Sequence, residues 1–176
     1  MAINLLTHWR HHGHCSISDH VSGEYHHYTI RELVEEDLDS LLDLYGHLHD
    51  SDDPQPSRDQ VESVWSEALG NNCIRYFGYF VDGRLIRSCT ATVVPNLTRA
   101  CRPYAVVENV VTHRQFRKRG CGKAVLQAAL DFAWRMNCYK VMLMTGRLNE
   151  STFSFYESVG FRRDKKQAFV AEPNSQ

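Results

Sequence analysis

Apolar and polar positions in the first half of the chain predict one strand followed by two helices. The run from Tyr28 to Leu33 alternates between the two kinds of side chain, as in a half-buried strand. Apolar residues then recur at helical spacing over 38–48, after acidic residues that favour a helix N-terminus. Prolines and polar residues make 50–57 a loop. A second helix follows, with the apolar stripe Val61, Val64, Trp65, Ala68 and Leu69.

The second half predicts a hairpin and then alternating helices and strands. Two extended runs, 75–81 and 85–94, flank Asp82-Gly83, a strong signal for a hairpin turn. The next run, 104–112, is apolar except at Glu108 and Asn109. The remaining expected elements are a helix over 122–136 with Val125, Ala128, Ala129, Phe132, Ala133 and Met136 on its apolar face, a strand at 140–145, a helix at 151–159 and a last strand at 167–170. This order predicts a mixed sheet covered by helices.

The first 27 residues lack such a pattern and hold seven of the ten histidines. We therefore expect a poorly ordered, His-rich extension over 1–27 and a single domain over 28–176. Imidazole and thiolate are ligands of transition metals, so these histidines with Cys15 form an alternative metal site. The extension is the favoured interpretation. The six cysteines are scattered like reduced thiols, and no metal is expected.

Composition narrows the classes of partner. The 176 residues carry a formal net charge of -1 and a pI near 6.8, so no basic field points to nucleic acid or an anionic membrane. A hydrophobic content of 43% allows a core to form without disulfides or metals. No run of residues suits a transmembrane helix or a secretion signal, which leads us to expect a cytoplasmic protein.

A glycine-rich segment, Phe116 to Lys123, lies between an expected strand and an expected helix. Its glycines permit a tight turn with exposed backbone N–H groups, and its four cations and the helix N-terminus favour an anion. Ala124 stands where a P-loop needs Ser or Thr, and Val125 stands where a dinucleotide fingerprint needs its third glycine. Both nucleotide motifs are therefore disfavoured.

The pattern that remains at 117–122, Arg-x-x-Gly-x-Gly, resembles the coenzyme A loop of the GNAT superfamily of N-acetyltransferases. The segment 149–161, with its Phe155-Tyr156 pair and a Gly-Phe ending, is similar to that family's closing motif. The resemblance implies an α/β (α+β) fold with a single GNAT-like domain, in which helices flank a mixed, mostly antiparallel twisted sheet. It also implies acetyl-CoA as co-substrate, and dimers are frequent among similar proteins, so a homodimer is one expected state.

The same resemblance implies a set of cofactor contacts. Backbone N–H groups near the end of the strand 104–112 would polarise the thioester oxygen, the glycine loop would bind the diphosphate, and Asn149 would contact pantetheine. The expected cofactor-binding residues are Val110, Val111, Thr112, Arg117, Lys118, Arg119, Gly120, Cys121, Gly122, Lys123, Asn149 and Tyr156.

Acetyl transfer to an amine needs a base for the amine and an acid for the departing thiolate. Glu108 is the candidate base because it interrupts an apolar strand beside the expected cofactor site. Two alternatives carry the same weight as the role of base: Glu108 pairs with a nearby arginine, or it orients the substrate without taking a proton. Asn109, a second candidate substrate contact, faces the opposite side of a regular strand, and a β-bulge would alter this. Tyr156 is the candidate acid, a role that the resemblance supports.

Two other residues invite catalytic roles that we disfavour. Cys121 suggests a covalent acetyl-enzyme, but it lies where the diphosphate is expected, so direct transfer in a ternary complex is preferred. His113, at a strand end, is expected to contact the cofactor arm or solvent.

The favoured function is acetylation of a small-molecule amine. Residues 108–111 and 137–140 look most like the glucosamine-6-phosphate N-acetyltransferases, although Asn109 stands where those proteins commonly have Asp. A protein lysine or N-terminal acetyltransferase and a non-catalytic acetyl-CoA-binding module are the alternatives.

Overall fold

The computed structural model describes residues 14–21, 24–48, 54, 56–117 and 123–173. Their strands form one sheet, ordered from β1 to β6 along the chain: β1 (His14–Val21), β2 (Glu24–Glu32), β3 (Ile74–Val81), β4 (Arg84–Val94), β5 (Tyr104–Thr112) and β6 (Val141–Leu143). Neighbouring strands are antiparallel from β1 to β5, whereas β5 and β6 are parallel. The mixed, mostly antiparallel sheet is thus confirmed.

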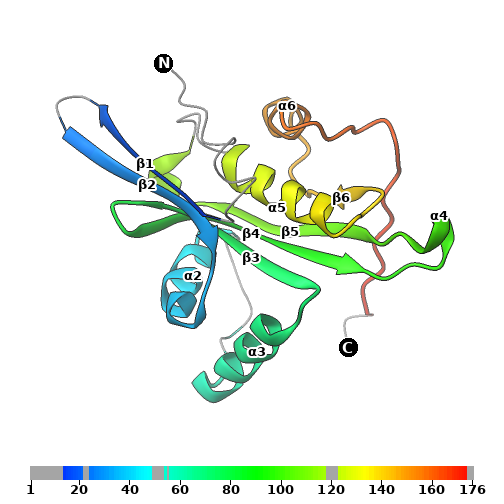
Figure 1. Ribbon diagram of the computed structural model, residues 1–176, viewed down its shortest axis with the longest axis horizontal. Coiled ribbons are helices and arrows are strands. Elements are labelled where there is room, and N and C mark those ends of the chain that lie inside the picture. The colour runs from blue at the N-terminus through cyan, green and yellow to red at the C-terminus, as the bar shows by residue number, and fades with distance from the viewer. Residues whose placement is uncertain (1–13, 22–23, 49–53, 55, 118–122, 174–176) are drawn as a thin grey trace.

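Helices cover both faces of the sheet (Figure 1). One face carries η1 (Glu35–Asp37), α2 (Leu38–Tyr45) and α3 (Arg58–Gly70), and the other carries α5 (Lys123–Arg135) and α6 (Glu150–Glu157). The short helices α4 (Thr98–Cys101) and η2 (Arg114–Phe116) lie in the connections before and after β5. The four helices that the hydrophobic pattern predicted are confirmed, and none of the described helices is long and apolar enough to cross a bilayer.

Each face of the sheet has its own apolar core. The predicted face of α5 is buried against the sheet, except for Met136, which follows the last helical residue and is 39% exposed. On the other face, Trp65 is the buried residue of α3, and its indole Nε1 donates to the carbonyl of Glu35 at 3.2 Å. The neighbouring Val64 was predicted in the same stripe but is 60% exposed. Helix α3 therefore packs on the sheet through a narrower stripe than its sequence indicated.

The turn between β3 and β4 is formed as predicted. Asp82 and Gly83 have φ values of 49° and 80°, which suit a tight hairpin turn of the primed type. The Asp82 carboxylate also accepts a hydrogen bond from the backbone N–H of His27 at 2.8 Å, so the turn is fastened to β2. The hairpin places the start of β4 beside the end of β5, where the expected cofactor loop begins.

The two ends of the chain differ from the sequence expectations. Residues 14–27 were assigned to a poorly ordered extension, but β1 pairs with β2 over its whole length, from His14 opposite Arg31 to Val21 opposite Glu24. Polar residues between Cys15, Ile17 and Val21 hid this strand pattern. Residues 1–13 and the histidines there lie outside the described residues.

The prediction of a strand at 167–170 is wrong. This segment forms no strand, and Phe169 and Val170 are 90% and 76% exposed. A short apolar run becomes a strand only where a neighbouring strand edge takes up its backbone hydrogen bonds. The strand predicted at 140–145 does form as β6, but it is shorter than expected.

Candidate active site

Strand β5 has a partner on its β6 side over only part of its length. The parallel pairing joins Ala105, Val106 and Val107 to Val141, Met142 and Leu143, where β6 ends. Within the described residues, no strand pairs with that edge of β5 from Glu108 to Thr112. Backbone N–H and C=O groups along an unpaired edge are available to an extended ligand, and the predicted thioester contacts of Val110, Val111 and Thr112 lie here.

A β-bulge lies at the point where the pairing with β6 stops. Ser88 of β4 pairs with Val111 of β5, and Thr90 of β4 pairs with Glu108. The single residue between Ser88 and Thr90 therefore lies opposite two residues of β5, Asn109 and Val110. One of those two is Asn109, whose φ of 51° is in the left-handed region that Asn tolerates better than most side chains.

The bulge changes which side chains face each layer of helices. Val107 and Val110 both contact the core beneath α5, although residues three apart face opposite sides of a regular strand. Val111 contacts the core beneath α2 and α3 instead. The regular alternation expected for Glu108 and Asn109 therefore does not hold, and the bulge considered in the sequence analysis is present.

Tyr156, which lies in α6, is close enough to the bulged part of β5 to feel the charge of Glu108. Its ring packs against the core beneath α5 and lies 5.1 Å from the ring of Phe155 and 6.2 Å from that of Phe161, measured between centroids. Burial raises the pKa of the Tyr156 phenol, the positive charge of Arg147 lowers it, and Cys89 and Glu108 raise it further. The charge of Glu108 acts on Tyr156, so the structure brings the two predicted catalytic side chains into one neighbourhood.

Three buried hydroxyl groups lie on the α2 side of the sheet, and the sequence analysis did not predict them. Burial raises the pKa of Tyr45 to about 12, against the opposing influence of Thr90 and Asn109, whose side chains face its phenol. Within the described residues, the hydroxyls of Tyr45, Ser88 and Thr90 have no hydrogen bond of good geometry. The hydroxyl residues inside the apolar run of β4 were the signal that could have found this group.

The chain that leads from β5 toward the glycine loop is held by arginines. The Arg117 guanidinium donates to the carbonyl of Thr112 at 3.2 Å and to that of His47 at 2.8 Å. The buried Arg87 of β4 donates from Nη2 to the carbonyl of Phe116 at 2.9 Å. These bonds fix the approach to the loop. Lys118, Arg119, Gly120, Cys121 and Gly122 lie outside the described residues, and Lys123 is the exposed first residue of α5.

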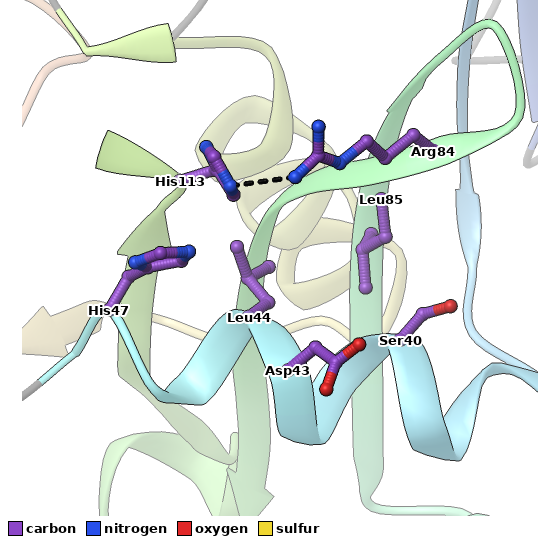
Figure 2. Close-up of a pocket in the computed structure, with 7 residues that line it drawn as sticks. All are labelled: Ser40, Asp43, Leu44, His47, Arg84, Leu85 and His113. Carbon is purple, nitrogen blue, oxygen red and sulfur yellow. Dashed lines mark hydrogen bonds between the residues drawn. The ribbon is translucent and has the colours of Figure 1, made fainter. Parts of the chain in front are cut away.

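His113 lies in a small polar pocket at the end of β5 (Figure 2). Arg84 Nη2 donates to its Nε2 at 2.8 Å, and the ring of His47 is 4.2 Å away, centroid to centroid. Burial lowers the pKa of His113, and the charges of His47, Arg84 and Arg117 lower it further. The predicted contact of His113 with the cofactor arm stays a prediction.

Asn149 has a structural task in addition to its predicted contact with pantetheine. It is the N-cap of α6, and its Oδ1 accepts from the backbone N–H of Thr152 at 2.9 Å and from Ser151 Oγ at 2.7 Å. The cap sets the start of the helix that carries Tyr156. The pantetheine contact stays a prediction.

The sequence profile of the acetyltransferase (GNAT) family matches residues 36–161. The chain belongs to the GNAT acetyltransferase family. A glucosamine 6-phosphate N-acetyltransferase of Trypanosoma brucei brucei is 30% identical over 139 residues, which are 78% of this chain and 91% of that protein. The resemblance drawn from the glycine loop and the closing motif is confirmed, and the chain is an N-acetyltransferase with acetyl-CoA as co-substrate.

Solved structures agree with this assignment. A putative acetyltransferase from Agrobacterium tumefaciens is 39% identical, with a TM-score of 0.74 over 81% of this chain and 99% of that one. The glucosamine-6-phosphate N-acetyltransferase of Arabidopsis thaliana has a TM-score of 0.73 over 84% of this chain and 99% of its own, at 20% identity. This second likeness shows the fold alone.

Proposed function

We propose that this acetyltransferase transfers acetyl from acetyl-CoA to a primary amine of a small molecule, by direct attack within a ternary complex. The observation that carries the proposal is the unpaired edge of β5 from Glu108 to Thr112, together with its bulge. Tyr156 lies on the α5 side of this edge, and the hydroxyls around Tyr45 lie on the α2 side. Donor and acceptor can therefore meet at the bulge from opposite faces of the sheet.

The donor is assigned to the α5 side. Backbone groups in the stretch Val110 to Thr112 that point away from β4 would bind the pantetheine arm, and an N–H group there would polarise the thioester oxygen. The segment 117–122 and the N-terminus of α5 would bind the diphosphate, because a helix N-terminus favours an anion. Arg117, whose guanidinium bonds to the backbone, would contribute its positive charge and the rigid start of the loop.

Glu108 and Tyr156 are assigned to the two proton transfers. The amine nitrogen attacks the thioester carbon, a C–N bond forms and the C–S bond breaks. Glu108 would take the amine proton, directly or through a water molecule, and Tyr156 would give its phenolic proton to the thiolate. The raised pKa of Tyr156 keeps it protonated at neutral pH, but it makes complete transfer to a thiolate unfavourable. Proton transfer is therefore coupled to cleavage of the C–S bond.

We propose an amino sugar phosphate as the first acceptor to test. The relative from Trypanosoma brucei brucei is a glucosamine 6-phosphate N-acetyltransferase. Asn109 lies beside Tyr45 and is the candidate contact on β5.

An acceptor screen tests this function. Release of free thiol from acetyl-CoA is followed with glucosamine 6-phosphate, glucosamine, a polyamine and a lysine peptide. Amino sugars are expected to be the best acceptors. Release with the peptide alone would identify a protein acetyltransferase, and binding of acetyl-CoA without release for any amine would identify a binding module.

The loop assignment is tested separately by Gly122→Asp. A carboxylate at the diphosphate site should weaken acetyl-CoA binding by about 100-fold or more, since two like charges a few ångströms apart repel strongly. Gly146→Asp is the matched control, because an added Cβ there meets nothing within 4 Å. Unchanged binding in the Gly122 variant would overturn the loop assignment.

We also propose a homodimer. In the described sheet β6 is an outer strand, and Phe169 and Val170 are exposed in an extended segment after it. Such apolar side chains and a strand edge favour association with a second copy. Light scattering measures the mass directly, and a monomer at all concentrations would contradict this state.

A further inference from the structure

A row of three polar side chains crosses the sheet on the side that α2 and α3 cover. Tyr76 of β3 pairs with Thr90 of β4, and Thr90 pairs with Glu108 of β5. Residues that pair directly across antiparallel strands point to the same face, with their Cβ atoms about 4.5–5.5 Å apart. Tyr76 packs against the apolar core beneath α2 and α3, so Thr90 and Glu108 face that side too. The row therefore ends at the candidate base, on the open edge of β5.

Tyr45 brings a phenol from α2 onto this row. Its side chain packs against the same apolar core as Tyr76. Burial raises the pKa of Tyr45, and the side chains of Thr90 and Asn109, which face its hydroxyl, oppose that rise. Thr90 is the residue opposite Glu108, and Asn109 is the residue that follows Glu108 in the bulge. The Tyr45 phenol thus lies between the two neighbours of the candidate base.

The hydroxyls of Tyr45 and Thr90 are placed at a cost in stability. Both are buried, and within the described residues neither has a well-formed hydrogen bond. A buried hydroxyl without a partner destabilises the fold, whereas Phe or Val would fill nearly the same space without a polar group. The Glu108 carboxylate is a strong acceptor on the same face and directly across from Thr90. This placement suits the support of Glu108 better than it suits the core.

We propose that Tyr45 is a positioning residue for the reaction, which acts through Thr90 and Asn109 to hold Glu108 in the direction where its carboxylate meets the amine. Thr90 supports Glu108 from the opposite strand, and Asn109 carries the bulge that follows it. Because the hydroxyls of Tyr45 and Thr90 are buried, neither touches the acceptor. This role rests on the proposed function, in which Glu108 takes the amine proton.

Tyr76 provides the matched control for Tyr45. It is a half-buried phenol on the same core, and burial raises its pKa as well. However, it lies in β3, on the side of Thr90 away from Glu108, and its ring packs edge to face on Trp65 with 4.8 Å between centroids. Tyr76→Phe therefore removes a phenol from the same face of the sheet, at the end of the row away from β5.

Thr92 is the matched control for Thr90. It lies two residues further along β4, on the same face of the strand, and pairs with Val106 in the regular part of β5. Thr90→Val and Thr92→Val make the same exchange of a hydroxyl for a methyl group. The first removes a hydroxyl opposite Glu108, and the second removes one opposite an apolar side chain.

The experiment measures kcat, the KM of each substrate and Tm in these four variants. Thiol release is followed with glucosamine 6-phosphate, or with the fastest amine of the acceptor screen if that is another. Tyr45→Phe and Thr90→Val should each lower kcat about tenfold, about the effect of one hydrogen bond to a charged group, and leave the KM of acetyl-CoA within about twofold. Thr90→Ser, which keeps the hydroxyl, should keep most of the rate. Tyr76→Phe and Thr92→Val should stay within about twofold of the wild-type kcat.

Two further readouts separate positioning from a structural role. The Tm of Tyr45→Phe should not fall, because among the described residues the lost hydroxyl has no well-formed hydrogen bond. Combining Tyr45→Phe with Glu108→Gln should give the rate of Glu108→Gln alone, since no base is left to position. If Tyr45→Phe does not fold, Thr90→Val takes its place in this cycle.

Each outcome supports or overturns the proposal. An unchanged kcat in Tyr45→Phe, an equal loss in Tyr76→Phe, or losses that multiply in the double variant would overturn it and leave the proposed function standing. A rate that Glu108→Gln leaves unchanged would reject Glu108 as the base, and the positioning role with it. A wild type that releases no thiol with any amine would reject the proposed function itself.

Discussion

The two halves of β5 are built from one continuous run of sequence, yet they do different things. Residues 105–107 pair with strands on both edges, and Ala105 and Val107 are buried. Among residues 108–112, Glu108, Val111 and Thr112 pair with β4 and no described strand lies on the β6 side; the first two side chains of this stretch are polar and exposed. The first half joins β4 to β6, and the second half has backbone groups that no described strand pairs with on the β6 side.

The difference between the halves comes from two local features that coincide. Strand β6 ends opposite Val107, and the bulge at Asn109 begins two residues later. The end of β6 opens the edge, while the bulge changes which side chains face the helices on each side. A regular β5 beside a longer β6 would be paired along that whole edge and would turn different side chains toward the helices. In the proposed mechanism, the site therefore lies where the regular pairing of β5 stops.

Removing a phenolic hydroxyl beside each half gives the largest expected contrast. Tyr156→Phe should lower kcat by about 100-fold, since general acid catalysis typically contributes a factor of that order, with little change in Tm. Tyr139→Phe is the control, because Tyr139 packs edge to face with Tyr104 at the start of the regular half. Rates of thiol release with a productive acceptor measure both. An unchanged rate in Tyr156→Phe would remove Tyr156 as the acid.

A second pair of variants tests the bulge. Asn109 and Asn137 both have positive φ, 51° and 58°, but Asn137 lies in the turn after α5. Replacing either with Ala should cost about 1 kcal/mol of unfolding free energy, because Ala is strained in the left-handed region. Asn109→Ala should also lower kcat/KM, whereas Asn137→Ala should leave it unchanged. Equal activity in the two variants would show that the bulge does not shape the site.

The regular half of the fold could be predicted from the sequence because its signals are local. Asp82-Gly83 specifies its turn by backbone conformation, and the spacing of apolar residues in α5 matches one buried helix face. The predictions for the two terminal segments were wrong because their structure depends on contacts that are not local. Whether 14–21 or 167–170 forms a strand depends on an edge elsewhere in the chain, and hydrophobic alternation does not report that edge.

The candidate site was predicted in part. Glu108 became a candidate because a carboxylate interrupts an apolar strand, and Tyr156 became one through a family motif; the structure places them near each other, and their roles stay predictions. Tyr45 and Arg87 were missed, because each looked like an ordinary member of a helix or strand. Their contacts are with distant segments, the bulge at Asn109 for Tyr45 and the carbonyl of Phe116 for Arg87. Such contacts between distant segments require the folded structure.

A variant of His113, the first residue after β5, gives the smallest expected effect. Burial and the charges of His47, Arg84 and Arg117 lower its pKa, so the folded protein binds this proton less readily than the unfolded chain does. The contribution of the neutral His113 imidazole to the free energy of unfolding is therefore fully present above the ordinary pKa of histidine. It is lost as the pH falls through the lowered pKa of the folded protein. The Tm of the wild type should fall more between about pH 7.5 and about pH 5.5 than that of His113→Gln. His27→Gln, at an exposed histidine of β2, is the control. Identical pH dependence in the wild type and His113→Gln would show that the cations around the end of β5 do not act on this imidazole.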